Sequence, residues 1–413
     1  MCGILGKVDK SKAKLYTNLA TFNLSMEMLS NRGPDFSNIW RKKGAILGHT
    51  RLAVIEPSTD GNQPMTGYGY VVVFNGEIYN YKILREELIL KGYQFKTNSD
   101  TEVLLAGWDF WKSDLLNRIN GMFAFAILDI KSNNLVIARD RFGKKPLYYA
   151  EKSGELLFSS NLLALEKISN IQFNIDLKAL SYFFQLRYVP GERTMFDGVF
   201  KLGAGCLLSY NKNGLSVTNW HDQAEKFSLI EPQESFSKNE LKKTIRTAVH
   251  DRMISDVPLG VFLSGGLDSA VVATLMSEKN PNVKTFTIGF PDSKEYDESK
   301  EARLMSMHLG SDHTEINVTA QSILNSLDLV FDGLDEPFSD NSAIPMYVLA
   351  QNVKDHVTVA LSGDGGDEIF AGYRKYKANM LAEKYQEIFK KITMGLETRS
   401  KYFSKKENKW NES

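Results

Sequence analysis

The sequence has little of what secreted, membrane-spanning or nucleic-acid-binding proteins need. Its 413 residues include two cysteines, Cys2 and Cys206, which excludes a disulfide framework and fits a reducing compartment. Lys plus Arg and Asp plus Glu each number 50, so no net charge attracts nucleic acid or an anionic membrane. No apolar run approaches the roughly 20 residues of a membrane helix, and the first residues lack a signal-peptide core. We therefore expect a cytoplasmic protein that binds neither nucleic acid nor a membrane.

Length and hydrophobic content indicate more than one domain. At 413 residues and 43% hydrophobic content, the chain can bury substantial cores, and its length suggests two or three domains. A polar stretch without periodicity lies between residues 220 and 238, and it contains Pro232 and several Ser and Glu residues. We place the domain boundary there, with one domain at residues 2–220 and another at residues 235–413.

A glycine-rich loop follows a short apolar segment in the second half, and a segment with helical apolar spacing begins directly after it. Gly265 and Gly266 allow backbone N–H groups to turn inward, and the helix directs its free donors to the same point, so the loop can hold phosphate. Ser264 and Ser269 add hydroxyl donors, and Asp268 can bind a metal ion that neutralises phosphate charge. An ordinary strand-to-helix turn is the alternative.

The whole motif, Ser-Gly-Gly-Leu-Asp-Ser at residues 264–269, resembles the pyrophosphate-binding loop (PP-loop) of ATP pyrophosphatases and adenylating amidotransferases. It is not a Walker loop, because the Gly-Lys-Ser/Thr ending is absent. That absence favours cleavage of ATP to AMP and pyrophosphate.

Cysteine at position 2 can be a nucleophile that carries its own base. If Met1 is removed, Cys2 holds a thiol and a free α-amine, whose reference pKa is about 8, on the same residue. A histidine would then be unnecessary. The alternative is a small apolar residue at the start of a strand. We expect Cys206, which lies in an apolar strand after glycines, to pack in a core.

Several residues after Cys2 could bind a substrate. Arg51 precedes a predicted strand at residues 52–55, and its guanidinium could pair with a carboxylate or form only a surface ion pair. Asn75 and Gly76 follow a strongly β-prone run; such a pair is usually a turn, but it could also bind an oxyanion. Asp100 could cap a helix or bind an ammonium group. Strands and helices occur in blocks, which indicates an α+β layered domain.

Six motifs of this half resemble the glutaminase domain of N-terminal-nucleophile amidotransferases, an αββα fold. They are Cys-Gly-Ile at 2–4, Arg-Gly-Pro-Asp at 32–35, Arg-Leu-Ala-Val-Ile at 51–55, Asn-Gly-Glu-Ile-Tyr-Asn at 75–80, Ser-Asp-Thr-Glu at 99–102 and Gly-Met-Phe-Ala-Phe-Ala at 121–126. The resemblance implies that Cys2 attacks the glutamine side-chain amide and releases ammonia. The implied substrate-binding residues are Arg51 for the α-carboxylate, Asp100 for the α-amine, Asn75 and Gly76 for the oxyanion, and Glu77 with the backbone of Val54.

The second half alternates predicted strands with helices, which indicates an α/β doubly wound parallel sheet with ligands beyond its strand carboxyl ends. Ser237 and Glu240 form a potential capping box ahead of it. A second loop, Ser-Gly-Asp-Gly-Gly-Asp-Glu at residues 362–368, follows the last predicted strand. Three carboxylates in five residues repel one another unless a cation lies among them, although a solvated acidic turn is the alternative. We expect acidic residues at 297–298 and 333–340 near the same cleft.

With the glutaminase-like half, these two loops resemble the glutamine-hydrolysing asparagine synthetases over nearly the whole chain. The resemblance implies that ATP with Mg²⁺ activates aspartate as β-aspartyl-AMP, which ammonia converts to asparagine. The implied ATP-binding residues are Leu263, Ser264, Gly265, Gly266, Asp268, Ser269, Ile288, Ser362 and Gly363. Asp268 and Asp367 are the implied Mg²⁺ ligands, and Asp364 would act on the adenylate or the ammonia. A homodimer is also expected from the family.

Two departures leave other functions open. Many asparagine synthetases have Ser-Gly-Glu-Gly-Ser-Asp-Glu at the second loop, whereas this chain has Asp364 and Gly366, as in relatives that amidate other carboxylates, including sugar acids. Only 49 residues follow Asp364, so we expect a shortened ATP-binding domain, and no lysine matches the one that approaches the nucleotide in the family. Amidation of another carboxylate and a glutaminase with an inactive synthetase half are the alternatives. A tRNA-modifying PP-loop protein is disfavoured by the neutral charge.

Overall fold

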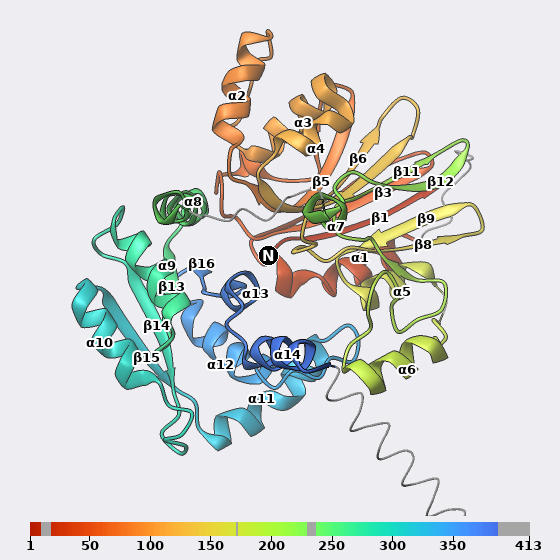
Figure 1. Ribbon diagram of the computed structural model, residues 1–413. Helices are drawn as coiled ribbons and strands as arrows, with labels where there is room; N and C mark the ends of the chain where they lie inside the picture. Colours follow the sequence, from red (N-terminus) through yellow and green to blue (C-terminus); the bar gives the residue numbers. More distant parts are fainter. Residues whose placement is uncertain (10–17, 171, 229–236, 387–413) are drawn as a thin grey trace, which may run out of the picture.

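The computed structural model describes residues 1–9, 18–170, 172–228 and 237–386 (Figure 1). Its N-terminal half contains two antiparallel six-stranded sheets packed face to face. The first sheet has the order β10-β8-β9-β1-β3-β2. Its strands are β1 (Gly3–Asp9), β2 (Phe36–Lys42), β3 (Ala45–Arg51), β8 (Tyr148–Lys152), β9 (Glu155–Ser159) and β10 (Phe200–Lys201).

The second sheet has the order β12-β11-β7-β6-β5-β4. Its strands are β4 (Met65–Gly67), β5 (Tyr70–Ile78), β6 (Gly121–Asp129), β7 (Leu135–Arg139), β11 (Cys206–Asn211) and β12 (Gly214–Asn219). The side chains of β6 alternate between two cores: Phe123, Phe125 and Ile127 face helices, and Ala124 and Ala126 face the first sheet. A strand buried on both faces needs this unbroken apolar run, which the sequence supplies.

Helices cover both outer faces of the sheet pair (Figure 1). Over the first sheet lie α1 (Leu19–Glu27) and α5 (Leu162–Ser169), and over the second lie α2 (Tyr81–Leu90), α3 (Asp100–Trp111) and α4 (Leu115–Arg118). Two further helices are α6 (Leu177–Leu186) and α7 (Gln223–Ser228), and the 3₁₀ helices are η1 (Ser30–Arg32), η2 (Thr59–Gly61) and η3 (Lys112–Asp114). These four layers confirm the predicted αββα fold. Cys206 is buried between the sheets, which confirms its predicted core position.

The C-terminal half contains a four-stranded sheet of order β15-β14-β13-β16, in which all three pairings are parallel. Its strands are β13 (Leu259–Phe262), β14 (Lys284–Gly289), β15 (Asp312–Asn317) and β16 (Val359–Leu361). Its helices are α8 (Lys238–Asp251), α9 (Leu267–Ser277), α10 (Ser299–Leu309), α11 (Ala320–Gly333), α12 (Ala343–Val353), α13 (Gly366–Phe370) and α14 (Arg374–Lys384). Helices α8, α9 and α10 pack on one face and α12 on the other, so the predicted doubly wound sheet is confirmed.

Several local predictions differ in detail from the structure. Of the predicted capping box, Ser237 accepts the Glu240 N–H at 3.4 Å, which caps α8. The Asn75-Gly76 pair is not a turn, because both residues lie within β5 opposite Ala124 and Phe123. The strand predicted at residues 52–55 does not form. The stretch predicted to separate the domains contains α7 and residues 229–236, which lie outside the described residues.

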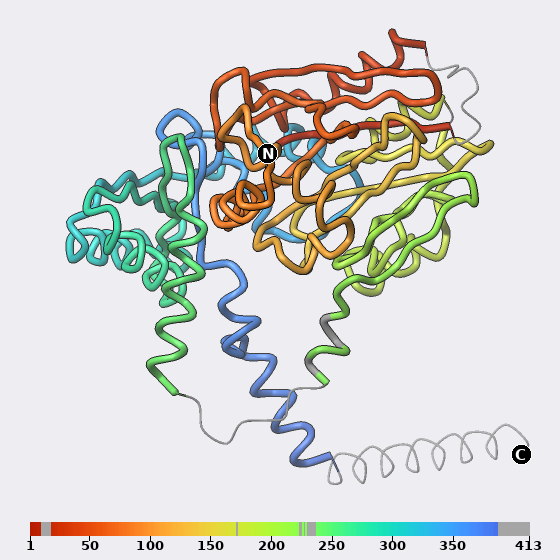
Figure 2. The backbone as a smooth tube through the Cα atoms, turned by 90° about the horizontal axis from the view of Figure 1, so that it is seen from above, coloured from red at the N-terminus to blue at the C-terminus, as the bar shows by residue number. Residues whose placement is uncertain are grey.

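The two halves meet beside the N-terminus, as both views of the backbone show (Figures 1 and 2). The Asp256 N–H donates to the Val54 carbonyl at 3.0 Å, and the Asp256 carboxylate accepts the Glu56 N–H at 2.8 Å. This contact joins the segment before β13 to the segment after β3. In the part of the chain that the structure describes, no helix combines the length and the apolar character needed to cross a membrane.

Candidate active site

The first candidate site is a cavity of about 230 Å³ close to the N-terminus. This volume is below the roughly 300–1,000 Å³ typical of sites for drug-sized ligands, and it suits a ligand the size of an amino acid. Every residue predicted from the glutaminase resemblance lines the cavity: Cys2, Arg51, Val54, Asn75, Gly76, Glu77 and Asp100. The fold therefore brings these seven positions, spread over 99 residues of sequence, to one ligand-sized space.

Cys2 precedes β1 and is half-buried. Its thiol donates to the Leu52 carbonyl at 3.6 Å, and Arg32 Nε donates to the Cys2 carbonyl at 3.1 Å. Burial raises the pKa of the Cys2 thiol, which makes an adjacent base necessary for a thiolate. Burial lowers the pKa of the Met1 amine to about 6. An amine in these surroundings is mostly neutral at pH 7 and can accept a proton.

Asn75 presents an uncompensated amide to the cavity. Its side chain is fully buried, and neither the amide nitrogen nor the amide oxygen has a hydrogen-bond partner among the described residues. A buried amide without partners is costly, so such a group is expected where a ligand completes its bonds. Gly76 permits close strand pairing here, because an added Cβ would overlap the Met122 carbonyl oxygen.

Asp100 is buried at the first turn of α3, where its carboxylate accepts the Ile78 N–H at 3.0 Å. Ser99 occupies the cap position and accepts the Thr101 N–H at 3.1 Å, so the reading of Asp100 as the N-cap is wrong. Burial raises the pKa of Asp100 to about 7, and it also raises the pKa of Glu77. A buried and a half-buried carboxyl group beside one cavity favour a cationic ligand group there.

Arg51 is buried and encircled by the loop that follows it. Its two terminal nitrogens donate to the carbonyl oxygens of Ile55 and Ser58 at 3.2 and 2.7 Å, to that of Glu56, and to Asn62 Oδ1 at 2.9 Å. These contacts explain why residues 52–55 form no strand, because the chain must curl to bring its carbonyls to one guanidinium. Arg51 is therefore no surface ion pair. Among the described residues, the Arg51 Nε–H has no hydrogen-bond partner, so it can donate to a ligand.

Sequence reasoning missed several residues of this cavity. Lys145 lines it and is 7% exposed, and burial lowers the pKa of its ammonium group while Glu77 opposes the shift. Its position in a run of charged turn residues was the only signal. The cavity is also lined by Thr358, Val359 and Ala360, which come from the parallel sheet of the other half. Nothing in the sequence links positions 2 and 359.

The second candidate site is a cavity of about 720 Å³ at the carboxyl ends of the parallel strands. The residues predicted from the two loops that line it are Leu263, Ser264, Gly266, Asp268, Ser269, Ile288, Ser362, Gly363, Asp364 and Asp367. Gly265 does not line it, because its N–H points to Glu298 and donates to that carboxylate at 3.0 Å. A single cavity therefore collects the phosphate loop, the acidic loop and apolar walls.

The phosphate loop is held by its own hydroxyl groups. Ser269 Oγ accepts the Ser264 N–H at 3.0 Å and lies 2.9 Å from Ser264 Oγ, which accepts the Gly266 N–H at 3.1 Å. Helix α9 begins directly after the loop, and no side chain caps its first turn. Its free N–H groups and positive dipole end are therefore directed at the cavity.

Asp268 and Asp367 both line this cavity, in which two close approaches require glycine. An added Cβ at Gly366 would overlap the Asp268 carboxylate, and one at Gly372 would overlap the Asp367 carboxylate. Among the described residues, no group of three or more His, Cys, Asp or Glu side chains is arranged to hold a metal. Two carboxylates fit Mg²⁺, which typically takes one or two protein carboxylates and completes its shell with phosphate oxygens and water.

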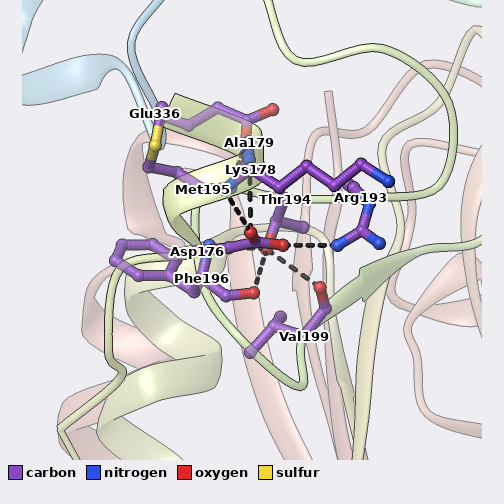
Figure 3. Close-up of polar contacts among 9 residues, drawn as sticks. All are labelled: Asp176, Lys178, Ala179, Arg193, Thr194, Met195, Phe196, Val199 and Glu336. Carbon is purple, nitrogen blue, oxygen red and sulfur yellow. Dashed lines mark hydrogen bonds and ion pairs between the residues drawn. The ribbon is translucent and has the colours of Figure 1, made fainter. Parts of the chain in front are cut away.

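The acidic segment at residues 333–340, which was expected near the cleft, does not line the second cavity. Asp335 accepts the Leu162 N–H at 3.0 Å and the Asn161 side-chain amide, at the start of α5. Glu336 accepts the Met195 N–H at 3.1 Å and pairs with Lys201. Figure 3 shows Glu336 near Asp176, which accepts the N–H groups of Lys178 and Ala179 and pairs with Arg193. Free N–H groups at a helix start attract carboxylates, which explains the position of Asp335. Asp335 and Glu336 therefore form contacts between the two halves of the chain.

One continuous segment, from β16 into the loop that follows it, lines both cavities. Residues 358–360 line the first cavity, and residues 362–364 line the second. Because a strand advances about 3.3 Å per residue, the two linings are separated by roughly 7 Å along the chain.

Comparison with known proteins identifies a matching family for each half of the chain. The family described as "Glutamine amidotransferase domain" matches residues 1–221, and the one described as "Asparagine synthase" matches residues 240–412. The Methanocaldococcus jannaschii protein "Putative asparagine synthetase [glutamine-hydrolyzing] 2" is 34% identical, over 90% of this chain and 76% of that protein. The chain belongs to the glutamine-hydrolysing asparagine synthetase family. The resemblance predicted from the sequence motifs is thereby confirmed.

Other members of this family are matched over less of their length. "Asparagine synthetase [glutamine-hydrolyzing] 1" of Bacillus subtilis is 34% identical over 391 residues, 94% of this chain. The chain spans 61% of the length of that relative.

Among solved structures, a glutamine phosphoribosylpyrophosphate amidotransferase from B. subtilis matches 83% of this chain and 95% of that chain, with a TM-score of 0.42 and 12% identity.

Proposed function

We propose that the chain is an enzyme that transfers glutamine nitrogen to a carboxylate activated by ATP, with aspartate as the acceptor and asparagine as the product. The convergence of the predicted residues on two cavities, lined by residues 358–360 and 362–364 of one continuous segment, is the observation that supports this function. In this proposal the glutaminase domain comprises residues 2–220 and the ATP-binding domain residues 235–413. We propose a cytoplasmic location, and a homodimer that sedimentation of the purified protein would test.

At the first cavity, Cys2 Sγ attacks the side-chain carbonyl of glutamine after its proton passes to the Cys2 α-amine, which is freed by removal of Met1. The Asn75 amide and the Gly76 N–H stabilise the oxyanion. The C–N bond then breaks, ammonia leaves with the proton, and water cleaves the thioester to give glutamate. The unpartnered amide of Asn75 supports this role most directly.

The other residues of the first cavity orient the glutamine backbone. Asp100 and Glu77 bind the α-ammonium group, whose positive charge favours their ionised forms. Arg51 faces the α-carboxylate with Nε–H and its positive charge, and it shapes the pocket through the loop that it holds. The Val54 backbone helps hold the substrate: its carbonyl oxygen accepts the Asp256 N–H and keeps a second lone pair for a ligand.

At the second cavity, the aspartate β-carboxylate attacks the α-phosphorus of ATP, the bond to the β-phosphate breaks, and pyrophosphate leaves. The loop at residues 264–269 binds the pyrophosphate, Leu263 and Ile288 flank the adenine, and Ser362 with Gly363 contacts the nucleotide. Asp268 and Asp367 would hold Mg²⁺, which would neutralise phosphate charge. Ammonia then displaces AMP from the adenylate, with Asp364 acting on the adenylate or on the ammonia.

One assay tests the proposal. The purified chain is incubated with glutamine, MgATP and aspartate, and glutamate, pyrophosphate and asparagine are quantified. Equal amounts of all three support asparagine synthesis. Glutamate alone indicates a glutaminase with an inactive synthetase half, and pyrophosphate only when aspartate is replaced by another acid, such as a sugar acid, indicates a different acceptor. ADP as the nucleotide product would contradict the assignment of the loop.

A further inference from the structure

The backbone of Phe74, the residue before Asn75, is held by side chains rather than by a neighbouring strand. Strand β4 pairs with β5 from Tyr70 to Val72 and ends there, and Phe74 is the next residue of β5 whose N–H and C=O face that edge. Gln63 Oε1 accepts the Phe74 N–H at 2.7 Å, and His49 Nε2 lies 3.0 Å from the Phe74 carbonyl oxygen. Both contacts are buried, so two side chains replace the missing strand.

Gln63 also reaches the opposite wall of the first cavity. Its Nε2 donates to Thr101 Oγ1 at 3.2 Å, and Thr101 directly follows Asp100 at the start of α3. Gln63 is 4% exposed and lines the cavity itself. One side chain therefore joins the strand that carries Asn75 to the helix that carries Asp100.

The bond geometry fixes the tautomer of His49. A carbonyl oxygen only accepts hydrogen bonds, so Nε2 carries the proton and Nδ1 does not. Nδ1 has no partner among the described residues, and the ring is fully buried. Burial lowers the pKa of His49 to about 3, so the ring stays neutral throughout the range in which the protein would work. His49 holds a carbonyl group in place and is not a base.

We infer that Gln63 and His49 are positioning residues of the glutaminase reaction: together they fix the Asn75 amide, and Gln63 also ties its strand to α3, beside the bond from the Ile78 N–H to Asp100. The inference rests on the proposed function of this cavity. Misplacing a reacting group by 1 Å costs about 100-fold in rate, and losing an oxyanion donor costs about 100- to 1,000-fold in kcat. Loss of His49 should therefore lower kcat alone, whereas loss of Gln63 should change both kcat and KM.

The test compares His49→Leu and Gln63→Met in the full chain, with glutamate release as the assay. The His49 side chain is bonded to the strand that carries Asn75, so His49→Leu should lower kcat about 10- to 100-fold and leave KM for glutamine unchanged. Gln63→Met removes both bonds and should lower kcat and raise KM together. His49→Gln can return an N–H donor to the Phe74 carbonyl and should restore part of kcat. The exposed residues Gln185 and His308 provide matched controls as Gln185→Met and His308→Leu.

A second measurement separates positioning from general damage. Alkylation of Cys2 by iodoacetamide forms no oxyanion, so its rate should be the same in His49→Leu as in the unaltered protein. If alkylation slows as much as glutamate release, or if kcat is unchanged, the inference is wrong. Asn75→Ala tests the underlying assignment separately: unchanged glutamate release in that variant would overturn the proposed oxyanion site itself, whatever the other two variants do.

Discussion

Replacing Asp100 by asparagine should make the protein more stable while it removes glutamine binding. The carboxyl group is 4% exposed, and burial raises its pKa from an ordinary value of 3.8 to about 7. That difference corresponds to about 4 kcal/mol, which the folded state loses when the carboxyl group is ionised. Asparagine keeps the shape and an acceptor for the Ile78 N–H without the charge. We expect a gain of about 2 kcal/mol at pH 8, with about 4 kcal/mol as the ceiling.

The pH dependence of this gain identifies its cause. Because the folded-state pKa of Asp100 is raised, the penalty is fully present above pH 7 and is relieved as the pH falls toward 3.8. Because the expected gain of about 2 kcal/mol is half of the full shift, the advantage of Asp100→Asn should grow by about 1.3 kcal/mol between pH 5 and pH 8, most of it below pH 7. Glutamine supplies an ammonium group to the ionised carboxylate, so it should stabilise the unaltered protein and not the variant.

Thermal unfolding at pH 5, 6, 7 and 8, with and without glutamine, measures these differences. A gain of 2 kcal/mol corresponds to an increase in melting temperature of about 4–8 °C for a unit of this size. Asp114→Asn is the matched control, because Asp114 is exposed just beyond the same helix and should change the melting temperature little. If the stability gain of Asp100→Asn is constant with pH, or if the variant is less stable at pH 8, Asp100 is not a buried carboxylate whose charge destabilises the ligand-free protein.

Three further predictions test other parts of the molecule. Cys2→Ala should abolish glutamate release and leave pyrophosphate release with ammonium salts unchanged; loss of both activities in a folded protein would contradict two separate sites. Gly366→Ala should reduce pyrophosphate release at least about tenfold, because the new Cβ displaces the Asp268 carboxylate, while glutamate release persists. Glu336→Ala should lower the melting temperature by the equivalent of about 1–3 kcal/mol, since Lys201 and the Met195 N–H lose a largely buried partner, whereas the exposed Glu295→Ala should have no such effect.

Much of the fold and many site positions could be predicted because their signals are local. Strand β13, the glycine loop and α9 follow one another within 19 residues, and the apolar spacing changes from strand to helix at the loop. Parallel strands place successive loops at one sheet edge, which brings residues 264 and 364 to one cavity. The sequence of each loop therefore predicts its chemistry without knowledge of how close the two loops lie in the fold.

The remaining features depend on contacts between distant segments. The two terminal nitrogens of Arg51 donate to a loop whose path is set by that same guanidinium, so neither can be predicted without the other. Asp335 and Glu336 have the composition of a cleft loop, and only the packing of the two halves directs them to α5 and Lys201. Gln63 carried no signal, because a glutamine near a proline has no characteristic partner.

The wall that β16 gives to the glutamine cavity has a consequence for biosynthesis. Ribosomes make Cys2 and Asp100 long before Thr358 and Val359, so the pocket of a growing chain lacks one side. Glutamine should therefore be poorly retained until the parallel sheet has folded against the earlier half. In the proposed function, the order of translation would thus delay ammonia release until the ATP-binding domain has folded.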